Sequence, residues 1–399
     1  MDVILCFGVI LALAFNFVNG LNGAGNSIAT IVATRALKPL YALLLAALCN
    51  IAGPFLLTTA IAKTIGTGII QPYAMTPVVI IIALLCGIFI LGLLTAKGFP
   101  ISASNTLIGC MVGASIASYG ISGVIWPPPE MVKGVILAGF SGALCIALLF
   151  TLLAILIHNS IRLFAIAGVI IGFSLTIVGL MITGSLVVSG ILAIIIFVVI
   201  SPTLGFTAGF TLDMVVAYLF RFSRQSTRNR IFYPLQIIAG SLQALSNGAN
   251  DGLHAVGVIA ALFIAEGITS GFTAPSWVMI TSAVAIGLGT VFGGWNVITK
   301  MAKGITRIRP YQGFCASTAG GLIISGLTLS GIPTSSTHII SGSIAGVGAT
   351  RGKTAVDWNV IRGIVTAWIV TFPVSISVSM IVVLIFSELL KISSFIIRF

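Results

Sequence analysis

Long apolar runs follow one another along the chain and are separated by short polar breaks. The runs include 76–96, 131–157 and 359–390, and each is long enough to cross a bilayer as a helix of about 20 residues. With 58% hydrophobic residues, 7% charged residues and a mean hydropathy of +1.21, the 399-residue chain lacks the polar surface of a soluble protein. We predict an all-α polytopic membrane protein with about 10–12 transmembrane helices.

The charge balance indicates membrane orientation and argues against nucleic-acid binding. Lys and Arg number 19 against 7 Asp and Glu, a net charge of +12, but the basic residues lie in short clusters between apolar runs. Such clusters mark cytoplasmic loops. The strongest is RFSRQSTRNR at 221–230, which contains no acid. We expect this segment to form a cytoplasmic loop between two halves of the chain.

Two motifs recur in the same order. NGLNG at 19–23 resembles NGAND at 247–251 at an offset of 228 (247 − 19), and PISASNTLIG at 100–109 resembles PTSSTHIISG at 333–342 at an offset of 233 (333 − 100). Within each copy the two motifs are separated by 81 (100 − 19) and 86 (333 − 247) positions. Because order and spacing agree together, we interpret the pattern as an internal repeat and not as chance similarity.

The basic loops fall at different places in the two copies. Arg35 and Lys38 follow the first motif, where the second copy carries Glu266. Later in the second copy comes a basic group, where the first copy has Lys63: Lys300, Lys303, Arg307 and Arg309. Two halves of opposite orientation would each keep their basic loops in the cytoplasm, so we predict the inverted repeats of a secondary transporter. The predicted parts are a first repeat at 1–157, connecting helices with the basic loop at 158–231, and a second repeat at 232–399.

Asp251 is an acid among apolar and small residues with no basic residue nearby in the sequence. An acid near the bilayer centre costs roughly 2.5–3.5 kcal/mol, so it requires a cation, a proton or a water-filled cavity. Asn247, Asn250 and Asn22 add hard oxygen ligands, and we predict a coupling-ion site here, with sodium bound at Asp251 and Asn250. His254, one turn beyond Asn250, is either a proton carrier or an interface hydrogen-bonding residue.

Hydroxyl groups cluster after a proline in both copies of the second motif. The clusters are Ser102, Ser104, Asn105 and Thr106, and Thr334, Ser335, Ser336, Thr337 and His338. Pro is favoured in the first turn of a helix and Ser or Thr can cap it, so each cluster is predicted to begin a broken or re-entrant half-helix. A single Ser/Thr cluster in a transmembrane helix more often serves helix–helix packing than ligand binding. The duplication instead favours two helix ends, each with free amides and a positive dipole, that hold a tetrahedral oxyanion.

The sequence supports no catalytic constellation. Ser335 and His338 lie three residues apart, but there is no acid to orient the His and no G-x-S-x-G context. P-loop and dinucleotide fingerprints are also missing from the sequence. We therefore expect no enzyme activity and no cofactor, and expect transport energy to come from a sodium or proton gradient.

Four segments together resemble the inorganic phosphate transporter family, the Pit or sodium-phosphate symporter type. They are NGLNGAGNSIATIVATRAL (19–37), GFPISASNTLIGCMVGAS (98–115), NGANDGLHAVGVIA (247–260) and GIPTSSTHIISGSIAGVGA (331–349). The resemblance extends from residue 19 to about residue 350. It implies two inverted repeats and uptake of inorganic phosphate driven by sodium ions or protons, with some relatives carrying sulfate.

The resemblance also implies roles for individual residues. Asn250 and Asp251 match the motif that binds the coupling cation, and Asn26 matches the later Asn of the first copy. The predicted phosphate-binding residues are Asn26, Ser102, Ser104, Thr106, Ser335, Ser336 and Thr337. His338 matches the His that closes the hydroxyl motif, and with His254 it is a candidate proton relay.

Three positions depart from the family pattern. Gly23 stands where the family has an Asp, Asn105 where it has a His, and Ala103 where it has a hydroxyl. One acid fewer means one fewer cation site or proton acceptor, and less negative charge to repel a dianion. The departures leave open the number of coupling ions and the choice between phosphate and sulfate.

We predict a multi-pass cell-membrane transporter that carries inorganic phosphate by cation-coupled symport with alternating access. A sulfate permease of the same family, a passive anion channel and an intramembrane hydrolase are the alternatives. The expected partners are phosphate or sulfate and the lipid bilayer, with no nucleic acid, and a homodimer is left open.

Overall fold

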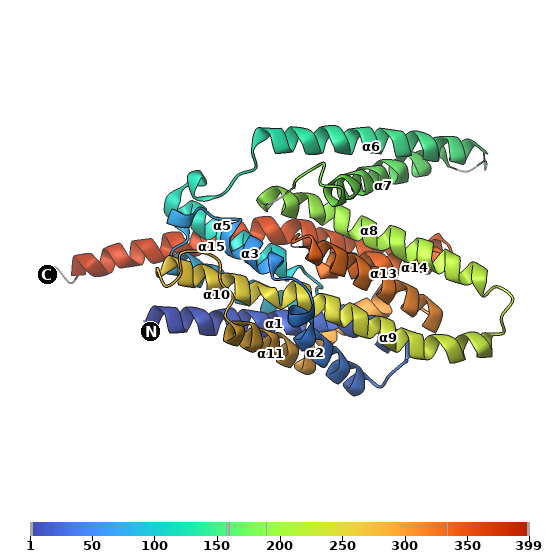
Figure 1. Cartoon of the computed structure of the whole chain (residues 1–399), viewed down its shortest axis with the longest axis horizontal. Helices are drawn as coiled ribbons and strands as arrows, with labels where there is room; N and C mark the ends of the chain where they lie inside the picture. Colours follow the sequence, from blue (N-terminus) through green and yellow to red (C-terminus); the bar gives the residue numbers. More distant parts are fainter. Residues whose placement is uncertain (1–2, 157, 159, 189, 333, 397–399) are drawn as a thin grey trace.

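The computed structural model describes residues 3–156, 158, 160–188, 190–332 and 334–396, and most of its helices run along one long axis (Figure 1). The α-helices are α1 (Val3–Thr34), α2 (Pro39–Leu56), α3 (Ala60–Thr67), α4 (Pro77–Ala96), α5 (Ala103–Tyr119), α6 (Pro129–Leu156), α7 (Ile161–Ile182), α8 (Gly190–Leu219), α9 (Gln225–Asp251), α10 (Leu253–Ala265), α11 (Ser276–Phe292), α12 (Trp295–Thr299), α13 (Pro310–Leu329), α14 (Ser336–Ala349) and α15 (Trp358–Ile396). Short 3-10 turns lie at η1 (Pro72–Ala74), η2 (Ile121–Gly123) and η4 (Lys353–Ala355), and a π-helical turn at η3 (Lys300–Gly304).

The helices confirm an all-α polytopic membrane protein. Eight described helical segments are long and apolar enough to cross a membrane, and a ninth forms if α11 is joined to the segment Trp295–Gly304 across a 65° bend. The predicted half-helices explain why this number is below 10–12. α5 has 17 residues and α14 has 14, so at 1.5 Å per residue α14 extends only about 21 Å into a core of about 30 Å.

Serine caps begin both half-helices. The Ser102 hydroxyl accepts a 3.2 Å hydrogen bond from the Asn105 amide, and the Ser335 hydroxyl accepts one of 3.3 Å from the His338 amide. The expected place of the proline was wrong for the first copy, because Pro100 lies two residues before the Ser102 cap and not in the first turn of α5. Its carbonyl accepts a hydrogen bond from Trp368 Nε1 at 2.9 Å. Pro333 of the second copy lies outside the described residues.

Helices of the two sequence halves pack crosswise against each other. α1 packs on α11 and α2 packs on α9. A Cβ atom on Gly20 would collide with the Ile286 carbonyl oxygen, and one on Gly248 with the Asn50 carbonyl oxygen. Since Gly20 and Gly248 are 228 positions apart (248 − 20), both close contacts occur at the same place in the repeated motif.

The half-helices have matching partners as well. α5 packs along α15, and α14 packs along α8. A Cβ on Gly113 of α5 would collide with the Ile376 carbonyl oxygen, and one on Gly346 of α14 with the Phe206 carbonyl oxygen. The two glycines are 233 positions apart (346 − 113), the offset of the hydroxyl motifs. Small residues thus let the backbones approach closely, as is common between membrane helices.

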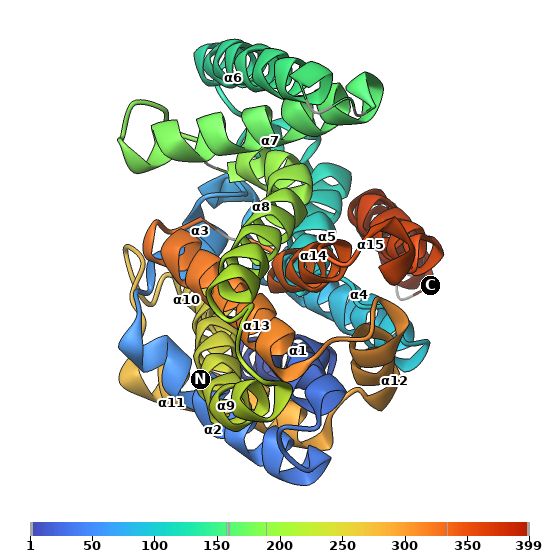
Figure 2. The same cartoon turned by 90° about the vertical axis from the view of Figure 1, so that its right-hand side faces the viewer.

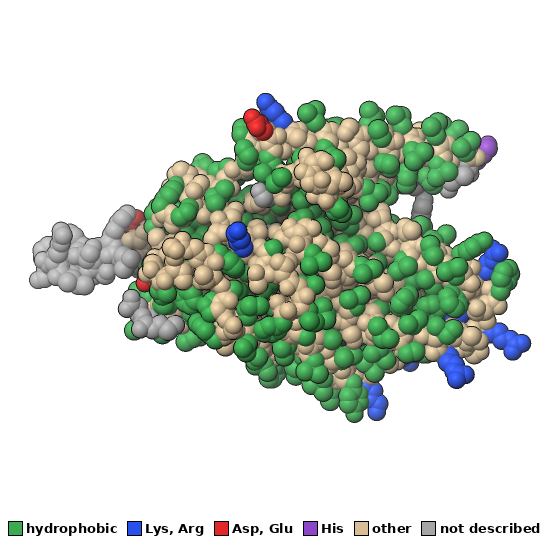
Figure 3. Space-filling view, viewed as in Figure 1, with side chains coloured by type: hydrophobic (Ala, Val, Ile, Leu, Met, Phe, Trp, Pro, Cys, Tyr) green, Lys and Arg blue, Asp and Glu red, His purple; other side chains and the backbone are tan. Residues whose placement is uncertain are grey.

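The arrangement gives the molecule two distinct ends. α1 starts at the left-hand end of Figure 1, whereas α9 starts at the right-hand end, next to the α8–α9 turn. The space-filling view shows most of the Lys and Arg side chains of this face gathered at the right-hand end (Figure 3). α6 and α7 pack together at one edge, while α14 lies in the middle of the bundle when the view is along the helices (Figure 2).

Candidate functional site

The predicted site residues are all buried inside the helix bundle. Each side chain is at most 6% exposed, so the site is closed to bulk water in this conformation. They belong to five helices or their caps: Asn22 and Asn26 on α1; Ser102, Ser104 and Thr106 at α5; Asn247, Asn250 and Asp251 on α9; His254 on α10; and Ser335, Ser336, Thr337 and His338 at α14.

Asp251 ends α9 and is held by neutral donors. Its Oδ1 accepts a 2.6 Å hydrogen bond from Asn250 Nδ2, and its Oδ2 accepts a 2.9 Å hydrogen bond from the Ser336 hydroxyl. Hydrogen bonds to a charged group are roughly twice as strong as neutral ones. The carboxylate therefore links the end of α9 to the first turn of the half-helix α14.

Asn26 connects α1 to the same half-helix. Its Nδ2 lies 3.2 Å from the Ser336 hydroxyl oxygen and 2.9 Å from that of Thr337, to which it donates. Gln243 Nε2 of α9 donates to the Asn26 backbone carbonyl. Gln243 had not been predicted, because a single Gln in an apolar helix carries no local signal of its partner 217 residues away.

The two half-helix starts are tied down in matching ways. Asn22 Nδ2 donates to the Ile101 carbonyl at 2.8 Å, and Asn250 Nδ2 donates to the Thr334 carbonyl at 2.9 Å. The two half-helix starts also contact each other. The Thr337 hydroxyl donates to the Ile101 carbonyl at 3.2 Å, and the Ser104 hydroxyl donates to the Thr334 carbonyl at 3.4 Å. The amino-terminal ends of α5 and α14, with their positive dipoles, therefore meet in the middle of the network.

His254 is integrated into this network through both ring nitrogens. Its Nδ1 lies 2.7 Å from the Asp251 carbonyl oxygen and its Nε2 lies 2.9 Å from the Ser104 hydroxyl. Asn19 Nδ2 is 3.3 Å from both the same carbonyl oxygen and the same Nδ1. Asn19 is a second residue missing from the predicted set, although the repeated NGLNG motif that begins with it was a signal.

Several amide oxygens in the site have no hydrogen-bond partner among the described residues. They belong to Asn19, Asn26, Asn247 and Asn250, and the Nδ2 atom of Asn247 is unpartnered as well. Buried carbonyl oxygens in a site that also contains a carboxylate are hard ligands suited to a cation such as sodium. Among the described residues, no group of three or more His, Cys, Asp or Glu could hold a metal ion.

Five predicted residues do not join the network through their side chains in the described contacts. One is Asn247, whose amide has no hydrogen-bond partner among the described residues. Ser102 and Ser335 cap their helices, and the Thr106 hydroxyl donates to the Ser102 carbonyl at 2.8 Å. His338 packs against Trp368 with ring centroids 4.1 Å apart, and neither of its ring nitrogens has a hydrogen-bond partner. The structure therefore brings Ser104, Ser336 and Thr337 into the network, but places His338 on its border.

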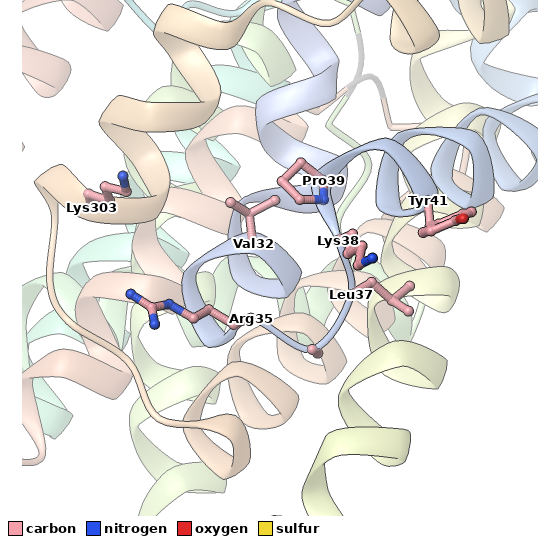
Figure 4. Close-up of a pocket in the computed structure, with 8 residues that line it drawn as sticks. Val32, Arg35, Leu37, Lys38, Pro39, Tyr41 and Lys303 are labelled. Atoms are coloured by element: carbon pink, nitrogen blue, oxygen red, sulfur yellow. The ribbon is translucent and has the colours of Figure 1, made fainter.

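No Lys or Arg side chain takes part in the hydrogen bonds described above for the network. Arg35, Lys38 and Lys303 line an open hollow of ≈ 670 Å³ at the α1–α2 turn (Figure 4). Arg35 directly follows α1, whose last residue Thr34 lies eight residues beyond Asn26, about 12 Å along the helix. The closed network consequently offers neutral hydroxyls, amides and helix ends to an anion.

The fold and its enclosed polar site define a multi-pass membrane transporter. The model of the phosphate transporter family matches residues 19–164 and 144–379. The chain belongs to this family.

Comparisons with individual proteins agree with the family assignment. The chain is 35% identical over 385 residues to a Rhizobium meliloti protein named "Probable low-affinity inorganic phosphate transporter", covering 95% of this chain and 97% of that one. A Bacillus subtilis protein of the same name is 33% identical, with 94% and 96% coverage. A solved structure titled "The sodium-dependent phosphate transporter" superposes with a TM-score of 0.69 at 23% identity, covering 97% of this chain and 100% of that one, and so shares the fold.

Proposed function

We propose that this protein moves inorganic phosphate across the membrane by cation-coupled symport, with access alternating between the two sides. In this proposal the transport unit consists of two inverted repeats, residues 1–157 and 232–399, which are joined by residues 158–231. Two observations support the inverted repeats: α1 and α9 start at opposite ends of the molecule, and glycines that are 228 or 233 positions apart make matching close backbone contacts.

In this proposal the phosphate is held by the hydroxyls of Ser104, Ser336 and Thr337, the Asn26 amide and the two half-helix ends. Ser102, Thr106 and Ser335 shape those ends. The coupling ion is held by Asp251 with Asn250, Asn247 and Asn22. Sodium is favoured by the name of the structural neighbour and by the amide oxygens that have no partner.

One contact carries the proposal: the hydrogen bond from the Ser336 hydroxyl to the Asp251 carboxylate. A cation at Asp251 would draw the carboxylate away from this hydroxyl, which would then be free to donate to phosphate. Binding of the cation and of the anion would thereby favour each other, as symport requires.

The decisive experiment is uptake of labelled phosphate into liposomes containing the purified protein. We expect an imposed sodium gradient, or a proton gradient applied separately, to drive accumulation, and expect Asp251→Asn to abolish the dependence on that gradient. Asp357→Asn, at an exposed loop acid, is the matched control. Uptake that ignores both gradients would identify a channel. Competition by sulfate at the same concentration as phosphate would identify a sulfate permease.

A further inference from the structure

Positions 23 and 251 are structural counterparts on α1 and α9. Each directly follows an Asn, Asn22 or Asn250, whose amide donates to the backbone carbonyl just before a half-helix. The two positions are 228 residues apart (251 − 23), the offset of the repeated motif. One holds a carboxylate and the other, Gly23, has no side chain.

Gly23 faces the cation-binding part of the site. A Cβ atom at this position would lie 3.2 Å from Asn247 Nδ2 and 3.9 Å from Asp251 Oδ2. Both atoms of the Asn247 amide are buried without a hydrogen-bond partner. A carboxylate on residue 23 would therefore accept from Asn247 and lie beside Asp251, where two negative charges would require an additional cation or a shared proton.

The charges of the network can be counted. Asp251 is the one acid among its described members. Asp213, another buried acid, contacts Thr350 at the far end of α14, 14 residues beyond Ser336 (350 − 336). Each half-helix end contributes roughly +0.5 charge, so the two together offset about one negative charge. One monovalent cation then balances Asp251, and the two helix ends balance a phosphate that carries a single negative charge.

We infer that each transport cycle carries one monovalent cation with one singly charged phosphate and moves no net charge, because Gly23 removes a second cation site. This inference rests on the symport proposed above and specifies its stoichiometry. Gly23 acts as a determinant of coupling ratio, although it has no side chain to touch either substrate.

The wild-type protein tests the inference directly. In liposomes at fixed sodium gradient and fixed pH, a potassium diffusion potential is set negative or positive inside and initial phosphate uptake is measured. We expect equal rates at both potentials. We also expect a tenfold gradient of the driving cation to give about tenfold accumulation of phosphate, against about a hundredfold for two cations. A rate that changes with the potential, or accumulation near a hundredfold, would overturn the inference.

Two variants at one position isolate the missing charge. Gly23→Asp should make uptake faster when the inside is negative and raise accumulation toward that of two cations. Gly23→Asn has nearly the same shape without the charge, and whatever its rate it should remain indifferent to the potential. If Gly23→Asn gains the same dependence as Gly23→Asp, the charge is not the cause and the inference is wrong.

The outcomes separate this inference from the function on which it rests. Uptake that no cation gradient drives would overturn the symport and the inference together. Gradient-driven uptake that also responds to membrane potential would overturn the inference alone. If neither variant folds, the wild-type measurements decide.

Discussion

The Ser336 hydroxyl donates to the Asp251 carboxylate across 2.9 Å, although the two residues lie 85 positions apart in the chain. The same hydroxyl is within 3.2 Å of Asn26 Nδ2, so one atom connects α1, α9 and α14. Substitutions around this atom should therefore alter the response to cation and to phosphate together.

Ser336→Ala should weaken the apparent affinities for both phosphate and the coupling ion. A hydrogen bond to a charged group contributes about 1.5–3 kcal/mol, so we expect the half-saturating concentrations to rise by roughly 10- to 150-fold. Uptake rates measured against each concentration check this. Ser330→Ala, at an exposed position after α13, is the control. A Ser336→Ala protein that loses phosphate affinity but keeps its cation affinity would show that the Asp251 contact has no part in coupling.

His254→Gln should slow uptake and leave its pH profile in place. In the described contacts both ring nitrogens face neutral groups: the Asp251 carbonyl and the Asn19 amide at Nδ1, and the Ser104 hydroxyl at Nε2. Loss of about one net hydrogen bond, about 1–1.5 kcal/mol, predicts a rate reduction of roughly tenfold. Uptake measured from acidic to alkaline pH is the test, and a flattened profile would instead identify His254 as a proton carrier.

Gly248→Ala should destabilise the protein strongly. The new Cβ would meet the Asn50 backbone, which cannot rotate away, and overpacking of this kind costs about 1–3 kcal/mol. Gly92→Ala is the matched control, because its Cβ would lie 3.8 Å from a Val18 methyl group. The midpoint temperature of thermal unfolding in detergent should fall for Gly248→Ala and stay unchanged for Gly92→Ala. Equal midpoints would show that α2 and α9 do not pack as described.

The basic end of the molecule should face the cytoplasm. Ser226 at the start of α9 and Ser270 after α10 are exposed and lie at opposite ends of a single predicted span, 225–265. In a variant without its native cysteines, Ser226→Cys should react with a membrane-impermeant maleimide only from the cytoplasmic side and Ser270→Cys only from the other side. Labelling of both from one side would contradict the orientation assigned from the basic loops.

Local signals predicted much of the architecture. Apolar runs specified the spanning helices, and the serines at 102 and 335 specified where the half-helices begin, because capping depends on neighbours three residues away. The same local preference places the Thr106 hydroxyl. It donates to the Ser102 carbonyl, as Ser and Thr near a helix start often do, and its role in binding phosphate stays a prediction.

Hydrogen-bond partners that are distant in the chain could not be predicted from the sequence. Asn16 Nδ2 donates to the Gly252 carbonyl at 2.9 Å, and the Ser282 hydroxyl does so at 2.7 Å, at the one-residue interruption between α9 and α10. These partners are separated by 236 and 30 positions, and neither residue belongs to a repeated motif. Single polar residues in apolar helices indicate that a partner exists, but not which one.

The crosswise packing of α1 on α11 and of α2 on α9 has a consequence for how the protein is made. When the ribosome has completed the first half, the glycine surfaces at Gly20 and Gly53 have been synthesised, but the backbones they contact at Ile286 and Leu245 have not. The early helices α1 and α2 therefore contact lipid at these surfaces until α9 and α11 are inserted. Assembly consequently ends with the association of early and late helices within the membrane, and a truncated first half lacks the backbones that Gly20 and Gly53 contact.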